Sequence, residues 1–408
     1  MALLILELSV FEFMNVNISG KQILKLLSLL LFIFAMLELS SFLTAKYLSS
    51  RFVIFYEPKI DSEKFEEYYA TYLRTRHEIL GPPLRFWNAG DRDNSGSRIV
   101  PAFPDPEEDD SCVSIYGDSF TWASGVGHDE AWGNLLSILL SCGVSNFGQL
   151  SYGTDQAFLR FELNMDDRAR VVILGHLSSD IMRNVAQSYG FVSPAPMSGL
   201  RYKPRFILER GELKLIPIPY FPLEEVRHAI LNPGKHLPSE YFVPGGDAGT
   251  LRLEFPYSWS MLKALLWNRQ LRAVLERRPY SLDFYDEDHS SGALELTTKI
   301  IESFYVLAVE RGKHPLVVIF PAPDDMQYFE KNGLWVYQSL IDSLNDKNIQ
   351  SLNIGEKLLE RYQGGDIDEI YIQEPKSKGH FNAEGNSLVA DIIYEYMNEK
   401  GLLKNLDY

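Results

Sequence analysis

The chain has 408 residues, 46% of them hydrophobic and 23% charged, a balance typical of a folded globular protein rather than of a long disordered one. Its formal net charge is −16 and no cluster of Lys and Arg interrupts the acidity, which argues against nucleic acid as a partner. Two cysteines are too few for a disulfide scaffold, and neither they nor the 8 histidines show metal-binding spacing. We therefore expect no metal and no cofactor.

The first informative stretch is an apolar run at residues 26–45, bracketed by Lys25 and Lys46. About 20 helical residues at ~1.5 Å each span ~30 Å, the thickness of the hydrocarbon core of a bilayer. Lys21 and Lys25 precede the run, which favours a cytoplasmic N-terminal segment at residues 1–25. The sequence thus predicts a single-pass signal anchor in the cytoplasmic membrane, with the rest of the chain outside the cytoplasm.

Two other interpretations of this run remain open. A cleaved signal peptide would also be apolar, but this run is long and no clear A-x-A cleavage site follows it. A buried helix of a globular domain would need a cover that the upstream residues do not provide. Glu38 within the run is costly in lipid unless it is neutral, paired or near the interface.

Residues 46–110 mix charge with Pro and Gly and end in the acidic run PAFPDPEEDD at 101–110. We interpret this part as a juxtamembrane linker region with a solvated acidic end.

From residue 111 on, short apolar strands alternate with helical stretches. The strands are predicted at residues 113–117, 144–148, 170–175, 315–320 and 349–354. Helices are predicted at residues 129–141, 155–163, 179–185, 292–311, 334–344 and 383–398. This alternation predicts one α/β domain over 111–408, a doubly wound five-stranded parallel sheet with flavodoxin-like strand order. The ligand site of such a sheet lies at the carboxyl ends of its strands.

The alternation is interrupted by an insertion at about 186–290, which we interpret as a lid or side wall. Residues 205–219 are expected to form a β-hairpin that turns at Arg210 and Gly211, and helices are expected at 223–231 and 258–277.

A serine and a histidine stand where such a sheet would bring them together. Ser119, in Gly117-Asp118-Ser119-Phe120, directly follows the first strand, so its hydroxyl would project at the carboxyl edge. His380 lies in the loop that opens the last helix and would take the Ser119 proton. Asp118 is expected to hydrogen-bond the turn. His176 is expected either to line the pocket or to be structural.

The ordered blocks of the sequence resemble those of the SGNH/GDSL hydrolase family. The blocks are GDSF (117–120), NFGQLSYGTDQ (146–156), ILGHLSSDI (173–181) and GHFNAEGN (379–386). PAFPDPEE (101–108) and KPRFIL (203–208) also look like a membrane-anchored bacterial branch of that family. The resemblance covers roughly residues 101–185 and 315–398.

The resemblance implies catalytic roles for Ser119 as nucleophile and His380 as base. It implies an oxyanion hole made by the N–H of Ser119, by Ser151 at the position of the family's Gly, and by Ser179 at that of its Asn. The family's acid stands three residues before the histidine, where this chain has Ser377; Glu374 is the candidate to replace it.

Substrate contacts are expected from Trp122 and Tyr152, which lie close in sequence to Ser119 and Ser151. The function implied is hydrolysis of an ester outside the cytoplasmic membrane, with acyl (acetyl) esters of surface glycans as substrates. Two alternatives stay open: an O-acyltransferase of exopolysaccharide, and a catalytically degenerate SGNH-fold protein of binding or assembly.

Cys112 and Cys142 lie near the feet of the first two predicted strands, which are neighbours in this fold. A disulfide outside the cytoplasm and two buried thiols are both compatible with that placement.

Overall fold

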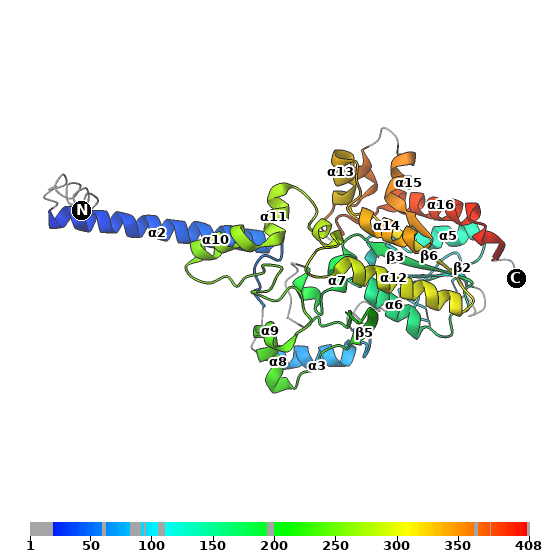
Figure 1. Cartoon of the computed structure of the whole chain (residues 1–408), viewed down its shortest axis with the longest axis horizontal. Coiled ribbons are helices and arrows are strands. Elements are labelled where there is room, and N and C mark those ends of the chain that lie inside the picture. Colours follow the sequence, from blue (N-terminus) through cyan, green and yellow to red (C-terminus); the bar gives the residue numbers. More distant parts are fainter. Residues whose placement is uncertain are drawn as a thin grey trace.

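The computed structural model describes residues 19–58, 63–81, 91–93, 95–104, 111–193, 200–362, 366–375 and 377–405. The later part of the chain forms an α/β body. One long helix, α2 (Gly20–Ser49), extends from one side of this body (Figure 1).

The body is built on a five-stranded parallel sheet with the order β2-β1-β3-β6-β7. The strands are β1 (Ser111–Tyr116), β2 (Gly143–Asn146), β3 (Val171–Leu177), β6 (His314–Phe320) and β7 (Ser351–Asn353). Every residue of β3 is buried, as expected of a strand covered on both faces. The predicted sheet and its flavodoxin-like order are confirmed.

Helices cover both faces of the sheet (Figure 1). On one face, α16 (Ala383–Glu399) packs against α5 (Trp132–Leu140) and α15 (Ile354–Arg361). On the other, α12 (Ala293–Glu310) packs against α6 (Thr154–Leu163). The other helices are α3 (Phe65–Thr75), α4 (Ser119–Trp122), α7 (Asp180–Asn184), α8 (Leu223–Leu231), α9 (Pro233–His236), α10 (Tyr257–Trp267), α11 (Arg269–Glu276), α13 (Pro323–Asn332) and α14 (Gln338–Asp346). Short 3₁₀ turns are η3 (Tyr189–Phe191), η4 (Tyr280–Tyr285), η5 (Ile367–Ile370) and η6 (Leu402–Asn405).

The insertion contains the predicted hairpin, β4 (Arg205–Glu209) paired antiparallel with β5 (Glu212–Ile216). Its turn residues Arg210 and Gly211 have φ of 57° and 81°, the left-handed pair that a two-residue hairpin turn requires. The stretch predicted as one helix at 258–277 is two helices, α10 and α11. The break is at Asn268, whose side chain accepts a hydrogen bond from the N–H of Leu271 (2.7 Å) and caps α11.

A buried lysine ties the insertion to the body. Lys203 Nζ lies 2.5 Å from a carboxylate oxygen of Asp155 in α6, and both side chains are almost fully buried. The same ammonium donates to the carbonyls of Arg183 and Ala186, at 3.1 Å each. All three of its donors therefore find acceptors, which makes a buried charge tolerable.

Part of the region predicted as a linker is packed into the body. Phe65, Tyr69 and Tyr72 of α3 belong to the main core, and the N–H of Arg98 donates to the carbonyl of Asn146 at the end of β2 (2.8 Å). The acidic run falls largely at residues 105–110, outside the described residues.

Cys112 and Cys142 form a disulfide with a Cα–Cα distance of 6.0 Å. It joins the first residues of β1 to the chain entering β2, so of the two sequence interpretations the bonded one is present.

Helix α2 contains the whole predicted anchor and extends it at both ends. Ser19 caps its start in a capping box with Gln22. Among the described residues, it is the one helix whose length and composition suffice to cross a membrane, and a signal sequence meets the same criteria.

Candidate active site

The first site element is the turn between β1 and α4. Asp118 caps α4, because its carboxylate accepts from the N–H of Phe120 (2.8 Å) and of Thr121 (3.5 Å). Gly117 is required here, since a Cβ at this position would lie 2.0 Å from Thr121 Oγ1. The turn therefore holds Ser119 at the carboxyl edge of the sheet, and Asp118 has the turn-forming role that the sequence indicated.

The structure brings Ser119 and His380 together across most of the chain. His380 Nε2 lies 2.9 Å from Ser119 Oγ, within the range of a hydrogen bond. Ser119 is 8% exposed, so its hydroxyl is partly screened from water. His380 stands just before Asn382, which caps α16 by accepting from the N–H of Gly385 (3.0 Å).

A backbone carbonyl orients the imidazole in place of the expected Glu374. His380 Nδ1 lies 3.1 Å from the carbonyl oxygen of Ser377, which can accept a hydrogen bond from the Nδ1–H. The side chain of Glu374 is exposed, and its main-chain carbonyl accepts a hydrogen bond from the N–H of Ser377. Ser377, which stands at the position of the family's acid, thus contacts His380 through its main-chain carbonyl. Within the described residues, the Glu374 side chain makes no contact with His380.

The electrostatics of His380 favour the neutral form that a base needs. Burial lowers the pKa of His380 from 6.5, partly opposed by the Ser377 carbonyl and the charge of Asp118. The imidazole is therefore mainly unprotonated at neutral pH, with a negative charge nearby that would stabilise the imidazolium once it forms.

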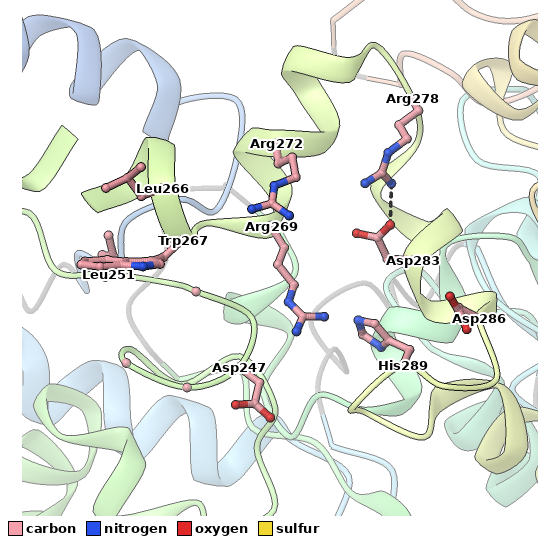
Figure 2. A pocket seen from close by; sticks show the side chains of 13 residues that line it. Asp247, Leu251, Leu266, Trp267, Arg269, Arg272, Arg278, Asp283, Asp286 and His289 are labelled. Carbon is pink, nitrogen blue, oxygen red and sulfur yellow. Dashed lines mark hydrogen bonds and ion pairs between the residues drawn. The ribbon is translucent and has the colours of Figure 1, made fainter. Parts of the chain in front are cut away.

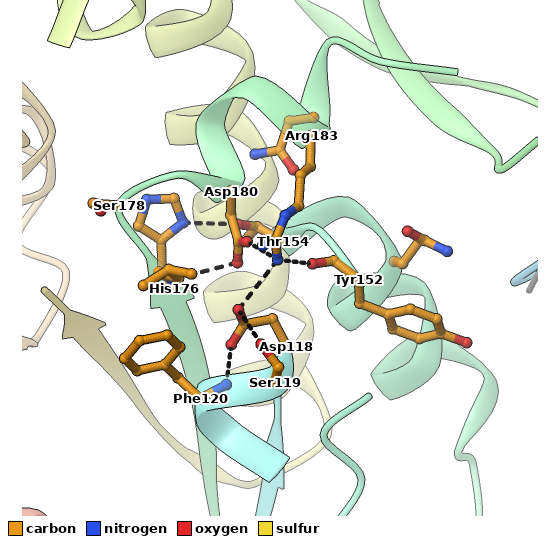
Figure 3. Close-up of polar contacts among 12 residues, drawn as sticks. Asp118, Ser119, Phe120, Tyr152, Thr154, His176, Ser178, Asp180 and Arg183 are labelled. Carbon is orange, nitrogen blue, oxygen red and sulfur yellow. Dashed lines mark hydrogen bonds and ion pairs between the residues drawn. The ribbon is translucent and has the colours of Figure 1, made fainter. Parts of the chain in front are cut away.

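Arg183 connects three parts of the carboxyl edge (Figure 3). Its Nη1 lies 3.1 Å from Asp118 and 2.7 Å from Asp180, and it donates to the carbonyl of Tyr152 (2.8 Å). Burial disfavours its charge, but Asp180 and Asp118 outweigh that cost, so the pKa of Arg183 is raised. The turns after β1, β2 and β3 are thus held together by one guanidinium.

The three predicted oxyanion residues stand at the ends of neighbouring strands. Ser119 follows β1, Ser151 follows β2 and Ser179 follows β3, and β1 lies between the other two. Ser151 has a φ of +69°, a conformation in which glycine is easier, which fits its place at the family's glycine position. Ser179 is half-buried at the N-cap of α7 and makes no side-chain capping bond.

The two predicted substrate contacts have different surroundings. The half-buried ring of Trp122 is covered by the guanidinium groups of Arg92 and Arg98, at 4.2 and 4.9 Å from its centroid. Tyr152 is buried and contributes its carbonyl to Arg183, so the observed polar contact near the site is made by its main chain.

His176 has a structural place behind the site. Its Nδ1 lies 2.7 Å from Thr154 Oγ1 and its Nε2 lies 2.9 Å from the hydroxyl of Tyr285. Because Tyr285 donates to the carbonyl of Ser178 (2.7 Å), it accepts from His176 Nε2. Burial lowers the pKa of His176 to about 3, so this ring stays neutral.

Sequence reasoning missed Arg183 and the Ser377 carbonyl. The spacing of Asp180 and Arg183 on one helical turn hints at an ion pair between them. Nothing in that spacing points to Asp118, which is 65 residues away. A main-chain acceptor leaves no trace in residue type at all.

No protein-family model matches the sequence, and no curated protein matches it. Solved structures that align with it include a member of the lipolytic protein G-D-S-L family from Veillonella parvula DSM 2008, at 13% identity, covering 69% of this chain and 96% of that one, with a TM-score of 0.34. The psychrotrophic esterase EstA from Pseudoalteromonas sp. aligns at 11% identity over 70% of this chain and 96% of its own, with a TM-score of 0.34.

A two-domain esterase (CEX) active on acetylated mannans aligns at 10% identity over 70% of this chain and 48% of its own, with a TM-score of 0.32.

Proposed function

We propose that this chain is a serine-dependent ester hydrolase of the SGNH/GDSL type, held at the outer face of the cytoplasmic membrane by α2. The observation that carries the proposal is the 2.9 Å contact between Ser119 Oγ and His380 Nε2 at the carboxyl edge of the parallel sheet. A buried serine beside a neutral histidine is the pair required for covalent acyl transfer.

In the proposed reaction, His380 Nε2 takes the proton of Ser119 as Oγ attacks the acyl carbon. The oxygen of that carbonyl takes the negative charge, and the N–H of Ser119 and the groups of Ser151 and Ser179 are the proposed donors to it. The ester C–O bond then breaks and the alcohol leaves with the proton from His380. Water, deprotonated by the same histidine, releases the acid and restores Ser119.

The location outside the cytoplasm is supported by the disulfide and by the charges at the start of α2. Disulfides persist in oxidising compartments, and Cys112 and Cys142 are bonded. Lys21 and Lys25 at the start of α2 favour a cytoplasmic N-terminus. For the substrate we propose acyl esters, acetyl in the first place, on surface glycans, because the KPRFIL and PAFPDPEE stretches resemble membrane-anchored bacterial relatives.

Reaction with a fluorophosphonate tests the nucleophile. Ser119→Ala is expected to abolish both labelling and hydrolysis of a short acyl ester. Ser124→Ala is a matched control, because Ser124 is also 8% exposed and its hydroxyl has no hydrogen-bond partner within the described residues. Labelling that persists in Ser119→Ala removes Ser119 as the nucleophile, and a wild-type chain that is folded but never labelled favours the non-catalytic alternative.

The topology has its own test. Full-length protein should stay in the membrane fraction after carbonate washing, with its C-terminal body accessible to protease added from outside. Recovery of a chain trimmed near Lys46 in the soluble fraction would instead establish a cleaved signal peptide.

A further inference from the structure

Helix α10 and the residues before it carry a large exposed apolar surface. Six large apolar side chains of α10 and the residues before it are 43–64% exposed: Phe255, Trp259, Leu262, Leu265, Leu266 and Trp267. Such a cluster in a globular protein marks a surface that something apolar covers.

This surface is continuous with the apolar helix α2. Helix α10 packs along α2, and both run toward the body (Figure 1). Ala264 of α10 shares a small core with Ala45, near the end of α2. At the other end, the ring of Phe255 lies 6.2 Å from that of Phe34. At ~1.5 Å per residue, Phe34 is roughly 16 Å further along α2 than Ala45.

A polar contact joins the start of α10 to Glu38 in the middle of α2. The carboxylate of Glu38 accepts hydrogen bonds from the N–H of Tyr257 and from the N–H and hydroxyl of Ser258, the first residues of α10. Glu38 is only 6% exposed, although its neighbours Leu37 and Leu39 in α2 are exposed. The first amides of a helix lack partners within it, and an unpaired amide or a bare carboxylate is costly in hydrocarbon. Here the amides of Tyr257 and Ser258 donate to the Glu38 carboxylate, so neither the amides nor the carboxylate are left without a hydrogen-bond partner.

We propose that residues 255–267 form a re-entrant segment that enters the outer leaflet beside α2, with the exposed apolar side chains named above in contact with lipid acyl chains. The proposal rests on α2 being a membrane anchor, as proposed above. If residues 26–45 span the bilayer, the contact between Phe255 and Phe34 places the tip of the segment near the middle of a ~30 Å hydrocarbon core. Backbone at that depth is tolerated when its polar groups are paired, as those of Tyr257 and Ser258 are.

At the other end of α10, a tryptophan and arginines stand beside the acidic residues Asp247, Asp283 and Asp286. Trp267, Arg269 and Arg272 line a cavity of about 750 Å³ between α10 and the body (Figure 2). Tryptophan and arginine are favoured at the level of lipid headgroups, where an aromatic ring and a cation meet phosphate. Apart from Lys263, the basic residues between Phe255 and Arg272 therefore lie after Trp267, toward the end that leads out of the bilayer.

Quenching by brominated lipid tests the proposal. The full-length chain would be reconstituted into phosphatidylcholine vesicles with or without bromine on the acyl chains, and tryptophan fluorescence compared. We expect brominated lipid to quench the wild type, and Trp259→Phe with Trp267→Phe to lose most of that quenching. Trp335→Phe is the matched control, because Trp335 is buried in the body and stacks on Phe329 with ring centroids 4.1 Å apart.

Carbonate washing of the same vesicles separates the two proposals. Protein that resists washing while brominated lipid quenches the wild type and the double variant equally would show that α10 faces water or another protein, which overturns the re-entrant segment and leaves the anchor standing. Protein released by washing overturns both.

Discussion

At the scale of single residues, the site depends on how one imidazole is held. Nε2 of His380 faces Ser119, and Nδ1 faces the carbonyl of Ser377. A carbonyl fixes the tautomer as a carboxylate would, but it carries no full charge to stabilise imidazolium. Asp118, which raises the pKa of His380, is the charged group that acts in that sense.

The first residue-scale prediction concerns pH. Because burial lowers the pKa of His380 below 6.5, the base stays unprotonated over most of the physiological range. We expect kcat/KM for a short ester to be constant near neutrality and to fall as the pH drops through a value below 6.5, measured in a detergent-solubilised full chain. A midpoint above 6.5 would contradict the assignment of His380 as the titrating base.

The second concerns Glu374. The sequence made it the candidate acid, but its side chain is exposed and Ser377 supplies the contact to Nδ1. Glu374→Gln is therefore expected to keep kcat close to that of the wild type, whereas loss of the acid in a Ser-His-Asp triad costs ~10⁴. His380→Ala is the comparison that should remove activity. A large loss of kcat in Glu374→Gln would mean that the loop closes on the histidine during the reaction.

The nucleophile and base were predictable because their residue types and flanking blocks are specific. The contacts that hold these two residues in place could not be predicted from the sequence. Arg183 contacts Asp118 only because the turns after β1 and β3 meet in space, and sequence separation does not report that distance. Ser151 stands at the position of the family's glycine, and its φ of +69° is a conformation that glycine adopts more easily.

At the scale of elements, the sheet and its helices followed from alternating apolar strands and helical stretches. Helices α13 and α15 were not predicted, and a further error arose where a helix changes direction within a helical pattern. Asn268 ends α10 and caps α11, so one predicted helix became two. The pattern could not show this because apolar residues continue on both sides of the break.

The disulfide between the feet of β1 and β2 gives an element-scale prediction. It closes a loop with a sequence separation of 30 residues, for which chain entropy gives a stabilisation of about 3–4 kcal/mol. Replacing Cys112 and Cys142 together by Ser should lower the free energy of unfolding by that order while leaving the Ser119 site able to react. Denaturant unfolding of both proteins in detergent measures the difference, and equal midpoints would show that the cross-link adds nothing.

A second element-scale prediction concerns the contact between α2 and α10. Glu38→Leu removes the acceptor for the first amides of α10, and each buried amide left unpaired costs about 1–3 kcal/mol. We expect faster amide hydrogen exchange at the start of α10 in this variant, read by mass spectrometry of the reconstituted chain. Glu38→Gln keeps an acceptor oxygen and should exchange much more slowly than Glu38→Leu. Equal exchange in all three proteins would show that Glu38 does not hold the helix.

At the scale of the whole molecule, the insertion and the region after the anchor are parts of one body. Lys203 binds the insertion to Asp155, and α3 contributes to the main core. Composition suggested a linker at 46–110 because charge, Pro and Gly are frequent there. The aromatic residues of α3 recur at a spacing that places them on one face of a helix. This spacing indicates a packed helix, and composition alone does not show it.

The direction in which the sheet faces has a consequence for kinetics. Helices α7 and α13, which follow β3 and β6, lie on the side of the body from which α2 extends (Figure 1), and α7 contacts η4, which contacts α11. The carboxyl edge of the sheet, where Ser119 lies, therefore faces the proposed bilayer surface. A substrate carried by a lipid would be met by diffusion in two dimensions, and its molar fraction in the bilayer would set the rate. Adding inert phospholipid at constant total substrate should then slow turnover of a lipid-linked ester and leave that of a water-soluble ester unchanged.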